Sequence, residues 1–428
     1  MDVVQAARLA HESGPICPAC VGRTLADRSR GFTNERRGEA ALDALAMADD
    51  RPRDEFDQDE PCWVCEDVCS RYDAFAELVV EALEGWEFDT YQVGTRVPAF
   101  LEENDRLLRE DVRGDPEAGE SLKRECNREI GKRVGQMTGA EVDFERPDIV
   151  ALVDLEEETV ELTVNSAFVY GRYRKLERGI PQTKWPCSDC DGTGQRHGEE
   201  CAGCGGSGFR YDRSVEQLTT PTVRAAMDGA DATFHGAGRE DIDARMLGGG
   251  RPFVIEVSRP RRRSVDIDEL QEDINEAAAG AVEVVGLRRA THEMVEHVKE
   301  LEASKTYEAS ISFDEAVDRA DLEAAVDRLE GATIEQETPT RVAHRRAEKT
   351  RTRTVHLAEV VEADDTTARI KIHGDGGLYI KELMHGDDGR TMPNLADELG
   401  VEITVDALDV VDVEAVGDAS FEDPEYLY

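Results

Sequence analysis

Lysine is scarce in this sequence. Only 9 of the 428 residues are lysine, and 51 basic residues stand against 94 acidic ones, which gives a formal net charge of −43. Such a charge repels nucleic acid at low salt. Because 39% of the residues are hydrophobic, we exclude disorder for most of the chain. The composition is instead typical of a folded protein from a high-salt cytoplasm, where the Debye length falls to about 3 Å and a locally basic cleft can still bind phosphate.

Long apolar runs are also absent. None approaches the length of a membrane span, and no apolar signal segment opens the chain. We therefore expect a cytoplasmic protein that has no membrane partner. A length of 428 residues favours about two to four domains over a single core.

Disulfides are not expected either, because eight of the 10 cysteines form C-x-x-C pairs, a spacing that favours metal binding in a cytoplasmic chain. Cys17, Cys20, Cys62 and Cys65 can supply a tetrahedral thiolate site, in which two C-x-x-C turns close the shell around one ion. Cys69 is a spare thiol that could replace one of these ligands. Structural zinc is favoured over redox chemistry, since no thioredoxin-like βαβ pattern surrounds either pair.

A second set of thiols, Cys187, Cys190, Cys201 and Cys204, has tighter spacing. The glycines that follow each pair allow the backbone to turn closely around a metal. The repeated C-x-x-C-x-G-x-G unit resembles the zinc domain of DnaJ-type chaperones, although the chain has no other feature of those proteins. Since four thiolates leave no open coordination position, this knuckle is predicted to hold structural rather than catalytic zinc.

The periodic segments divide the chain into four parts. Residues 1–70 form a zinc-stapled N-terminal module, whose acidic stretch 34–60 is expected to be polar with one short helix. Residues 71–185 form an α+β unit, residues 186–210 form the knuckle, and residues 211–428 form the largest unit. Strands and helices alternate irregularly in that last unit, which predicts a mixed sheet with helices on it. Its expected strands are 252–257, 281–287, 306–313, 350–361, 368–373 and 401–413, and its expected helices are 266–279, 293–302 and 314–330.

The segment 238–253 is charged, rich in glycine and poor in apolar surface, and it leads into an apolar strand. It contains two rival carboxylates, Asp241 and Asp243, with Arg239 beside them. A solvated charged face is the default interpretation of such a run. The glycines Gly248–Gly250 favour a close backbone approach instead. A metal site built on the two aspartates is not supported, because no histidine or third carboxylate stands at useful spacing.

Basic residues gather in islands, which in so acidic a chain are candidate phosphate contacts. One island lies within 170–185 and carries aromatic residues, and two others begin at Arg259 and Arg341. Few acidic residues lie within the latter two islands, so phosphate binding is favoured over surface ion pairing. The residues expected to bind RNA are Arg172, Arg174, Lys175, Arg261, Arg262, Arg263, Arg341, Arg345 and Arg346.

Together these motifs resemble those of the archaeal and eukaryotic tRNA pseudouridine synthases that modify position 55, and in archaea also position 54, of the TΨC loop. The resemblance implies an α+β fold class, with a THUMP-like RNA-binding domain in 71–185 and a pseudouridine synthase mixed-sheet domain in 211–428. The paired cysteines of the knuckle resemble those of archaeal members, and the acidic stretch 34–60 has no match. The motifs that carry the resemblance are the N-terminal cysteine pairs, Gly171–Trp185, Gly238–Phe253, Lys305–Tyr307, Arg341–Arg346 and Gly377–Asp387.

The resemblance also assigns roles to single residues. Asp241 matches the nucleophilic aspartate, and Tyr307 and Tyr379 match residues that contact the substrate uridine. Lys381 matches a basic residue set against the aspartate, and Arg239 is placed beside the flipped nucleotide or the carboxylate. The reaction breaks the N1–C1′ bond of uridine, turns the uracil and rejoins it through C5. It therefore needs an ionised carboxylate and an aromatic platform for a flipped base, but no cofactor or nucleotide.

The partner implied by the resemblance is tRNA, and we expect a monomer. Whether Asp241 adds to the ribose or removes its 2′ proton is left open. Two other classes of function also stay open. A catalytically inactive tRNA-binding protein is disfavoured by the intact Asp241, Tyr307 and Tyr379. A zinc-dependent RNA chaperone, suggested by the knuckle, is disfavoured because the chain has no companion co-chaperone segment.

Overall fold

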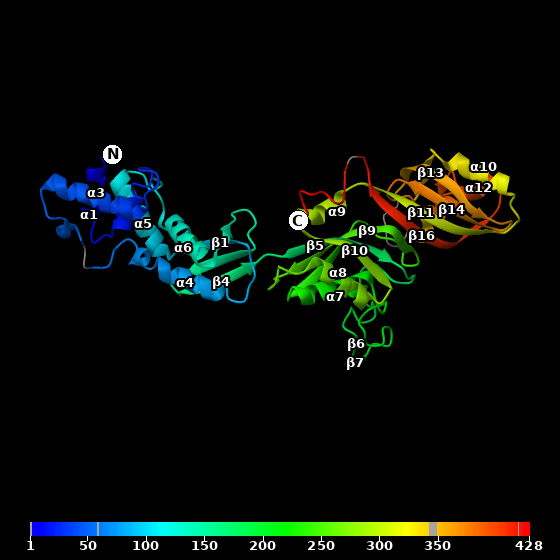
Figure 1. The fold of residues 1–428 in the computed structure, drawn as a ribbon, viewed down its shortest axis with the longest axis horizontal. Helices are drawn as coiled ribbons and strands as arrows, with labels where there is room; N and C mark the ends of the chain where they lie inside the picture. The colour runs from blue at the N-terminus through cyan, green and yellow to red at the C-terminus, as the bar shows by residue number, and fades with distance from the viewer. Residues whose placement is uncertain (1, 58–59, 342–348, 418) are drawn as a thin grey trace. The chain divides into compact units, whose positions relative to one another are not determined.

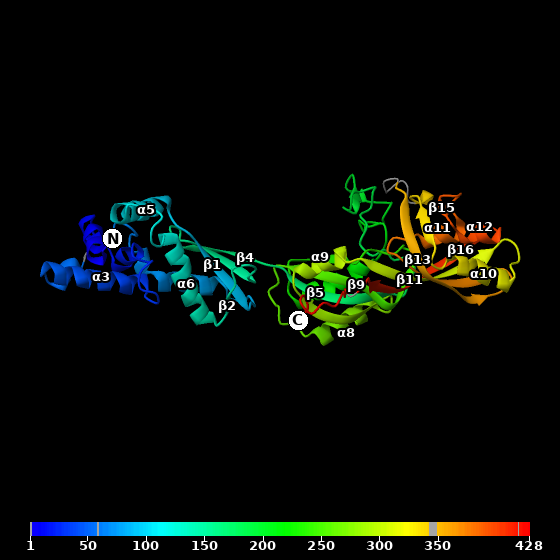
Figure 2. The same cartoon turned by 90° about the horizontal axis from the view of Figure 1, so that it is seen from above.

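The computed structural model describes residues 2–57, 60–341, 349–417 and 419–428. These residues fold into two compact units, Met1–Asn165 and Ser166–Tyr428, and each unit is described by itself. In Figures 1 and 2 the first unit runs from blue to blue-green and the second from green to red. None of the helices in the described ranges is long and apolar enough to cross a membrane.

The first unit packs helices on a four-stranded sheet of order β2-β1-β3-β4. Strand β1 is parallel to β2 and β3, and β3 is antiparallel to β4. Buried side chains alternate along β1 and β3, so one face of the sheet carries the core, and α4 and α6 contact these strands. The elements are α1 (Val3–Glu12), α2 (Pro18–Arg23), α3 (Asn34–Asp49), the 3-10 turns η1 (Arg53–Phe56) and η2 (Val68–Ser70), α4 (Tyr72–Ala82), β1 (Thr90–Arg96), α5 (Ala99–Arg113), α6 (Leu122–Thr138), β2 (Glu141–Val142), β3 (Ile149–Asp154) and β4 (Thr159–Val164).

Helix α3 is longer than the sequence predicted. The stretch 34–60 was expected to be polar with one short helix, but α3 alone spans 16 residues of it. The Thr33 hydroxyl caps the helix by accepting a backbone N–H, and Leu42 and Leu45 are buried. The sequence did not reveal the full length of this helix, because its buried face also contains Asn34, Arg37 and Gly38 and therefore lacks a continuous apolar stripe.

Helices α2 and α3 are in direct backbone contact. A Cβ added to Gly22 would lie 1.8 Å from the carbonyl oxygen of Asn34, and one added to Gly38 would lie 1.7 Å from that of Pro18. Only glycine fits at either position. This close approach fixes the helix that carries Cys20 against α3.

The zinc-stapled module and the THUMP-like sheet share one apolar core. Val64 of the module, Ile130 of α6 and Val153 of β3 are all fully buried in the same cluster. Residues on both sides of the expected boundary at 70 therefore belong to one compact unit.

The second unit is built on a ten-stranded sheet of order β10-β5-β9-β16-β11-β14-β13-β12-β15, with β8 also paired to β9. Strands β9 and β16 pair in parallel, and the other strand pairs named in this sheet are antiparallel, so the predicted mixed sheet is confirmed. The strands are β5 (Ala167–Lys175), β8 (Asp231–Gly236), β9 (Arg245–Ser258), β10 (Val282–Ala290), β11 (Ala303–Phe313), β12 (Thr333–Gln336), β13 (Arg351–Ala363), β14 (Thr367–Gly374), β15 (Thr391–Met392) and β16 (Ile403–Ala415). The helices are α7 (Val215–Ala226), α8 (Ile267–Ala278), α9 (Glu293–Glu300), α10 (Arg319–Leu329), α11 (Ile380–His385) and α12 (Leu395–Leu399).

The boundary between the two units lies at 165, earlier than the expected end of the RNA-binding domain at 185. Strand β5 pairs with β9 on one side and β10 on the other, inside the large sheet. Four consecutive residues of this strand, Phe168–Gly171, are buried, so both of its faces are covered. The strand has these surroundings because it lies inside the large sheet, and it therefore belongs to the second unit.

The sheet brings distant segments together. The loop that carries Asp241 joins β8 to β9, Tyr307 lies on β11, and Tyr379 directly precedes α11. Because β9 and β16 pair in parallel next to β11, these three segments meet at one place.

Candidate active site

These segments surround a cavity of about 870 Å³ in the second unit. This volume falls within the range of roughly 300–1,000 Å³ that is typical of small-ligand sites. Asp241, Asp243, Arg239, Tyr307, Tyr379 and Lys381, the expected substrate and catalytic residues together with the rival aspartate, all line the cavity. Other lining residues include Gln182, Trp185, Arg251, Lys305, Arg341, Leu408 and Val410.

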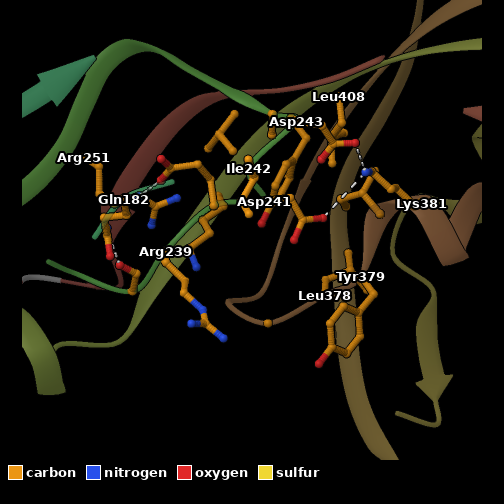
Figure 3. Close-up of a pocket in the computed structure, with 18 of the residues that line it drawn as sticks. Gln182, Arg239, Asp241, Ile242, Asp243, Arg251, Leu378, Tyr379, Lys381 and Leu408 are labelled. Carbon is orange, nitrogen blue, oxygen red and sulfur yellow. Dashed lines mark hydrogen bonds and ion pairs between the residues drawn. The ribbon is translucent and has the colours of Figure 1, made fainter. Parts of the chain in front are cut away.

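The Asp241 carboxylate lies between two cations. Its Oδ2 accepts a hydrogen bond of 2.9 Å from Nη1 of Arg341 and lies 3.7 Å from Nζ of Lys381. The side chain is 37% exposed, so it remains open to the cavity. Figure 3 shows the carboxylate directed toward Lys381, with Arg239 pointing elsewhere in the pocket. Two positive charges thus face the Asp241 carboxylate at the wall of the cavity.

Asp243 is the closer partner of Lys381. Its Oδ2 lies 2.7 Å from Nζ, and its side chain is 68% exposed. Burial opposes ionisation, but the hydrogen bond and charge of Lys381 outweigh it and hold the pKa of Asp243 below its ordinary value. Lys381 therefore reaches both aspartates, and the nearest cation to Asp241 is Arg341, which the sequence had assigned to RNA binding.

A buried ionic cluster supports the loop from below. The Glu240 carboxylate accepts hydrogen bonds from Nε of Arg251 (2.9 Å) and from the hydroxyl of Tyr173 (2.8 Å), and it lies 3.4 Å from Nζ of Lys175. Burial raises the pKa of Glu240, but these partners outweigh it and the net shift is downward. Arg251 also donates to the Ala237 carbonyl at 2.9 Å, so it holds the loop at its first residue as well as at Glu240.

Lys175 is a correction to the expected RNA contacts. Its side chain is fully buried, and its ammonium donates to the carbonyls of Ile180 (2.8 Å) and Asp241 (3.1 Å) as well as pairing with Glu240. A lysine in this position fixes the backbone of the loop that carries Asp241 and cannot reach a phosphate.

Tyr307 and Lys305 form the floor on β11. Only 9% of Tyr307 is exposed, and burial raises its pKa to about 12, so the phenol stays protonated at neutral pH. Lys305 stands in the motif Lys305–Tyr307, but the sequence analysis gave it no role. Burial, together with the charge of Arg251, lowers its pKa to about 8, so a fraction of this amine is neutral near neutral pH.

Tyr379 is held through its backbone. The amide of the fully buried Gln336 donates to the Tyr379 carbonyl at 2.9 Å and accepts from its N–H at 2.8 Å. The neighbouring Glu382 is also buried and accepts a 2.6 Å hydrogen bond from Nε of Arg341. Gln336 and Glu382 thus position Tyr379 and Arg341, and no sequence motif pointed to Gln336.

The other expected RNA-binding residues differ in their surroundings. Arg172 pairs with Glu422 at 2.7 Å and Arg174 with Glu283 at 3.0 Å, so both guanidinium groups have carboxylate partners within the protein. Arg261 and Arg262 are exposed, and Arg263 is partly exposed. Arg345 and Arg346 lie outside the described residues.

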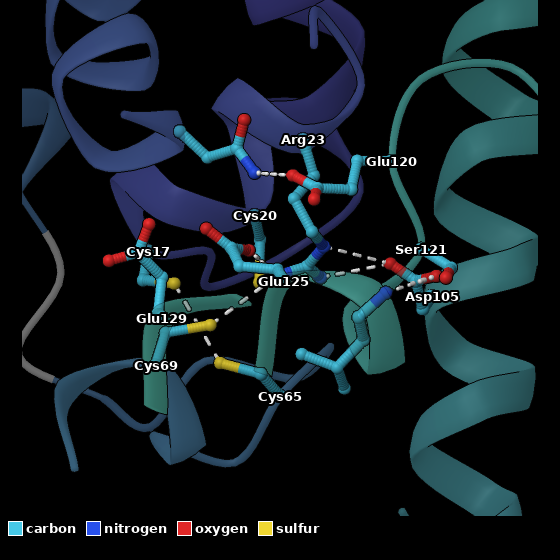
Figure 4. A network of polar contacts seen from close by, with 12 residues as sticks. Cys17, Cys20, Arg23, Cys65, Cys69, Asp105, Glu120, Ser121, Glu125 and Glu129 are labelled. Carbon is cyan, nitrogen blue, oxygen red and sulfur yellow. Dashed lines mark hydrogen bonds and ion pairs between the residues drawn. The ribbon is translucent and has the colours of Figure 1, made fainter. Parts of the chain in front are cut away.

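The N-terminal thiols form one cluster (Figure 4). The sulfurs of Cys17, Cys20, Cys65 and Cys69 all lie within 4.8 Å of one another and could hold a metal ion. The spare Cys69 is thus a member of this set, while Cys62, which the spacing predicted as a ligand, places its Sγ 3.5 Å from that of Cys20. Five thiols close together fit a four-coordinate zinc with one alternative ligand.

Arg23 lies beneath this cluster and is fully buried. It donates to the sulfurs of Cys20 (3.2 Å) and Cys69 (3.4 Å) and forms ion pairs with Asp105 (2.9 Å) and Glu125 (3.0 Å). Such contacts orient thiolate ligands from the second layer of a metal site.

The knuckle thiols Cys187, Cys190, Cys201 and Cys204 also lie within 4.8 Å of one another, as the spacing predicted. They form a small cluster separate from the core of the second unit. The short strands β6 (Gln195–Arg196) and β7 (Glu199–Glu200) pair between the two C-x-x-C turns. Across the described part of the chain, the two cysteine groups are the metal-ligand clusters found, and Asp241 and Asp243 belong to neither.

The mixed sheet and the pocket around Asp241 define the second unit as a domain of the pseudouridine synthase class. Residues 168–414 match the family "Pus10, C-terminal", and residues 75–154 match "Pus10 THUMP domain, archaeal". The chain belongs to the Pus10 family.

Relatives of the chain match it over its length. It is 55% identical over 427 residues to "tRNA pseudouridine synthase Pus10" of Halorubrum lacusprofundi, with 100% of each chain covered. It is 42% identical over 442 residues to the protein of the same name from Methanothrix thermoacetophila, with 98% of this chain and 96% of the other covered. A solved structure titled "Crystal Structure of a Cbf5-Nop10-Gar1 Complex" is 17% identical with a TM-score of 0.30, covering 46% of this chain and 45% of that one, which is too low to carry an argument.

Proposed function

We propose that this protein isomerises uridine to pseudouridine in tRNA, at positions 54 and 55 of the TΨC loop, with Asp241 as the catalytic carboxylate. The observation that carries the proposal is the Asp241 carboxylate, open to a nucleoside-sized cavity and flanked by Arg341 and Lys381. The relatives named as tRNA pseudouridine synthases support the substrate class.

The site supplies what the isomerisation needs. The N1–C1′ bond breaks, the uracil turns within the cavity, a C5–C1′ bond forms, and the proton lost from C5 is balanced by one gained at N1. Asp241 acts on the ribose in its ionised form, which Arg341 and Lys381 stabilise. No redox step, nucleotide or metal enters this balance, so the two cysteine clusters serve as structural zinc sites.

Tyr307 and Tyr379 have different roles in this proposal. Tyr307, protonated and nearly buried, supports the base from β11 and donates a hydrogen bond rather than acting as a phenolate base. Tyr379 is half-buried at the opposite edge, where it can stack on the flipped base. Arg239, exposed at the cavity, neutralises a phosphate of the flipped nucleotide.

The remaining assignments are proposals of the same kind. The THUMP-like part of the first unit and the exposed Arg261 and Arg262 contact the tRNA backbone, and the protein acts as a cytoplasmic monomer. Binding then depends on screening of the −43 charge, and molar salt is the appropriate assay condition.

The test incubates an unmodified tRNA transcript with the protein at molar salt and maps pseudouridine chemically. We expect product at positions 54 and 55 with the wild type and none with Asp241→Asn. Transcripts carrying cytidine at 54 or at 55 report each position separately. Absence of pseudouridine with the wild type would refute the proposed activity. Product at position 55 alone would show that position 54 is not a target.

A further inference from the structure

An aromatic pair and an arginine lie at the foot of the knuckle, and the proposed chemistry does not use them. The rings of Trp185 and Tyr211 meet edge to face at 81°, with centroids 5.6 Å apart. The guanidinium carbon of Arg210 lies 5.9 Å from each centroid. We refer to Trp185, Arg210 and Tyr211 as the Trp185 cluster. Both rings are partly exposed and Arg210 is exposed, so the cluster forms a surface.

The Trp185 cluster adjoins the active site. Trp185 lines the same cavity as Asp241. Arg210 and Tyr211 line a second, smaller cavity of about 270 Å³ beside it, together with Arg178. The cluster therefore reaches from the place of the target uridine toward a neighbouring depression that is large enough for one further base.

The segment before Trp185 is tied to the catalytic loop. The amide of Gln182 donates at 2.8 Å to the carbonyl of Gly238, in the loop that carries Asp241. The buried carboxylate of Glu216 accepts the backbone N–H of Lys184 at 3.0 Å and pairs with its ammonium at 3.1 Å. Trp185 is thus fixed relative to the reacting position.

The knuckle fixes the other side of the Trp185 cluster. The Arg210 N–H donates to the Trp185 carbonyl at 2.9 Å, and Pro186 faces Phe209 in an antiparallel bridge. The N–H of Cys187 then donates to the Gly208 carbonyl at 2.8 Å. This short neck leads directly into the thiol cluster, and Figure 1 shows the β6–β7 hairpin beyond it, standing out from the sheet. A metal held by the thiols would lock the neck and keep Arg210 over the rings.

Arg210 differs from the neighbouring arginines in its ion pairing. Arg178 pairs with Asp409 at 2.6 Å, and Arg213 pairs with Glu177 at 2.5 Å. Within the described ranges, Arg210 has ring contacts but no carboxylate partner, although the chain contains 94 acidic residues. An exposed guanidinium beside aromatic faces matches the chemistry of an unpaired base and its phosphate.

We propose that the Trp185 cluster binds an unpaired base of the substrate RNA next to the target uridine, by stacking on the aromatic rings with Arg210 at its phosphate. The knuckle then serves substrate binding by holding this cluster at the mouth of the active site. This inference rests on the proposed function, because it takes the RNA that enters the cavity as its ligand.

The first test compares Trp185→Ala, Trp185→Phe and the wild type with tRNA at molar salt. Since stacking of one base contributes a factor of about 5 to 150 in affinity, we expect Trp185→Ala to raise KM by roughly tenfold or more while kcat stays within about twofold. Trp185→Phe keeps a ring and should recover most of the loss. Phe32→Ala is the matched control, because it removes an exposed ring that lies under Arg36 in the N-terminal module, outside the THUMP-like part, and it should leave KM unchanged. An unchanged KM in Trp185→Ala overturns the proposal.

The second test identifies the base and separates this inference from the proposed function. Each nucleotide of the TΨC loop other than the targets is replaced in turn by an abasic one. At one position the wild type should lose its advantage over Trp185→Ala. If the KM ratio of the two proteins is the same for every abasic substrate, Trp185 contacts no base and the proposal fails.

Fluorescence supplies a readout that is independent of catalysis. The chain has 3 tryptophans, so a Trp63→Phe, Trp86→Phe double variant leaves Trp185 as the sole reporter. A single-stranded oligoribonucleotide of the TΨC-loop sequence should quench its emission, and Arg210→Gln should weaken the quenching. Quenching without any pseudouridine formation would refute the proposed function alone, whereas full activity without quenching would refute this inference alone.

Discussion

Both candidate sites rest on a fully buried arginine, but the charges around the two arginines have opposite signs. In the first unit Arg23 is surrounded by thiols and by two carboxylates, those of Asp105 and Glu125. In the second unit Arg251 and Lys175 surround one carboxylate, that of Glu240. Arg23 and the buried Arg109 balance the two carboxylates, so the thiols, as thiolate ligands, would give the first environment the excess of negative charge that suits a metal cation. The second has an excess of cations and suits an RNA, so the sign of the buried charge indicates the ligand in each case.

Lysine, scarce in the chain as a whole, is concentrated at the second site. Lys175, Lys305 and Lys381 are three of its 9 lysines, and all three lie at or beneath the cavity that Asp241 lines. A protein of net charge −43 thus presents a locally positive floor to its substrate.

Removing Arg23 should have the largest effect on stability. Arg23→Met removes the one guanidinium that pairs with both Asp105 and Glu125, and Asp105 keeps only its pair with Arg109 at 3.1 Å. Loss of the shared buried charge should lower the free energy of unfolding of the first unit by about 3–5 kcal/mol. Denaturant titration followed by circular dichroism measures the loss. Arg106→Met is the control, since Arg106 forms only exposed pairs with Glu103 and Glu110 and should change stability by less than about 1 kcal/mol. Equal losses of stability in Arg23→Met and Arg106→Met would show that the buried ion pairs of Arg23 contribute no more than exposed ones.

The corresponding change in the second unit is Glu240→Gln. It keeps a hydrogen-bonding group but removes the negative charge between Arg251 and Lys175, so we expect a loss of about 2–3 kcal/mol together with a fall in kcat of at least about tenfold. Glu283→Gln, which breaks the exposed pair with Arg174, is the matched control. A stable variant with full activity would mean that Glu240 does not support the Asp241 loop.

Lys305 gives the same site a pH dependence. Well below pH 8 the amine is protonated in both folded and unfolded chains, whereas between about 8 and the ordinary value of 10.5 mainly the unfolded chain keeps the proton. The free energy of unfolding should therefore rise across this window, by at most about 3 kcal/mol, relative to Lys305→Met. Lys371→Met, at an exposed ion pair with Glu359, should leave the pH profile of the wild type unchanged. If the difference in free energy of unfolding between wild type and Lys305→Met did not change with pH, the lowered pKa of Lys305 would be contradicted.

The two thiol clusters should differ most sharply when a ligand is lost, and the knuckle should show the smallest effect. Cys20 belongs to the core of the first unit, whereas Cys190 lies in a cluster separate from the core of the second. Cys20→Ser should destabilise the first unit by several kcal/mol, and Cys190→Ser should change unfolding of the second unit by less than about 1 kcal/mol. Calorimetry with and without a chelator measures the stability of both variants. Similar losses of stability in Cys20→Ser and Cys190→Ser would contradict the separation of the knuckle from the core of the second unit.

Features carried by local patterns could be predicted from the sequence. The knuckle thiols and the residues Asp241, Tyr307, Tyr379 and Lys381 were named from their motifs, and the structure brings the first set together and places the second around one cavity. The mixed sheet followed from alternating strands and helices.

Features that depend on long-range pairing could not be predicted. Glu240 meets Lys175 only because β5 lies beside β9 in the sheet, so a lysine inside a basic island turned out to be buried. Arg341, from another island, reaches Asp241 across 100 residues of sequence. Cys69 joins the N-terminal thiol group because η2 turns it toward Cys17, which C-x-x-C spacing does not encode.

Asp241 and Asp243 provide the most direct test of the central claim, because they lie two residues apart, line one cavity and share Lys381. The measurement is the single-turnover rate of pseudouridine formation in Asp241→Asn and Asp243→Asn, with the tRNA affinity of each variant determined in parallel at molar salt. We predict that Asp241→Asn binds tRNA within about threefold of the wild type but forms no product, and that Asp243→Asn keeps a rate within about tenfold of the wild type. Product formation by Asp241→Asn at the wild-type rate, or its complete loss in Asp243→Asn alone, would contradict the assignment of Asp241 as the catalytic carboxylate.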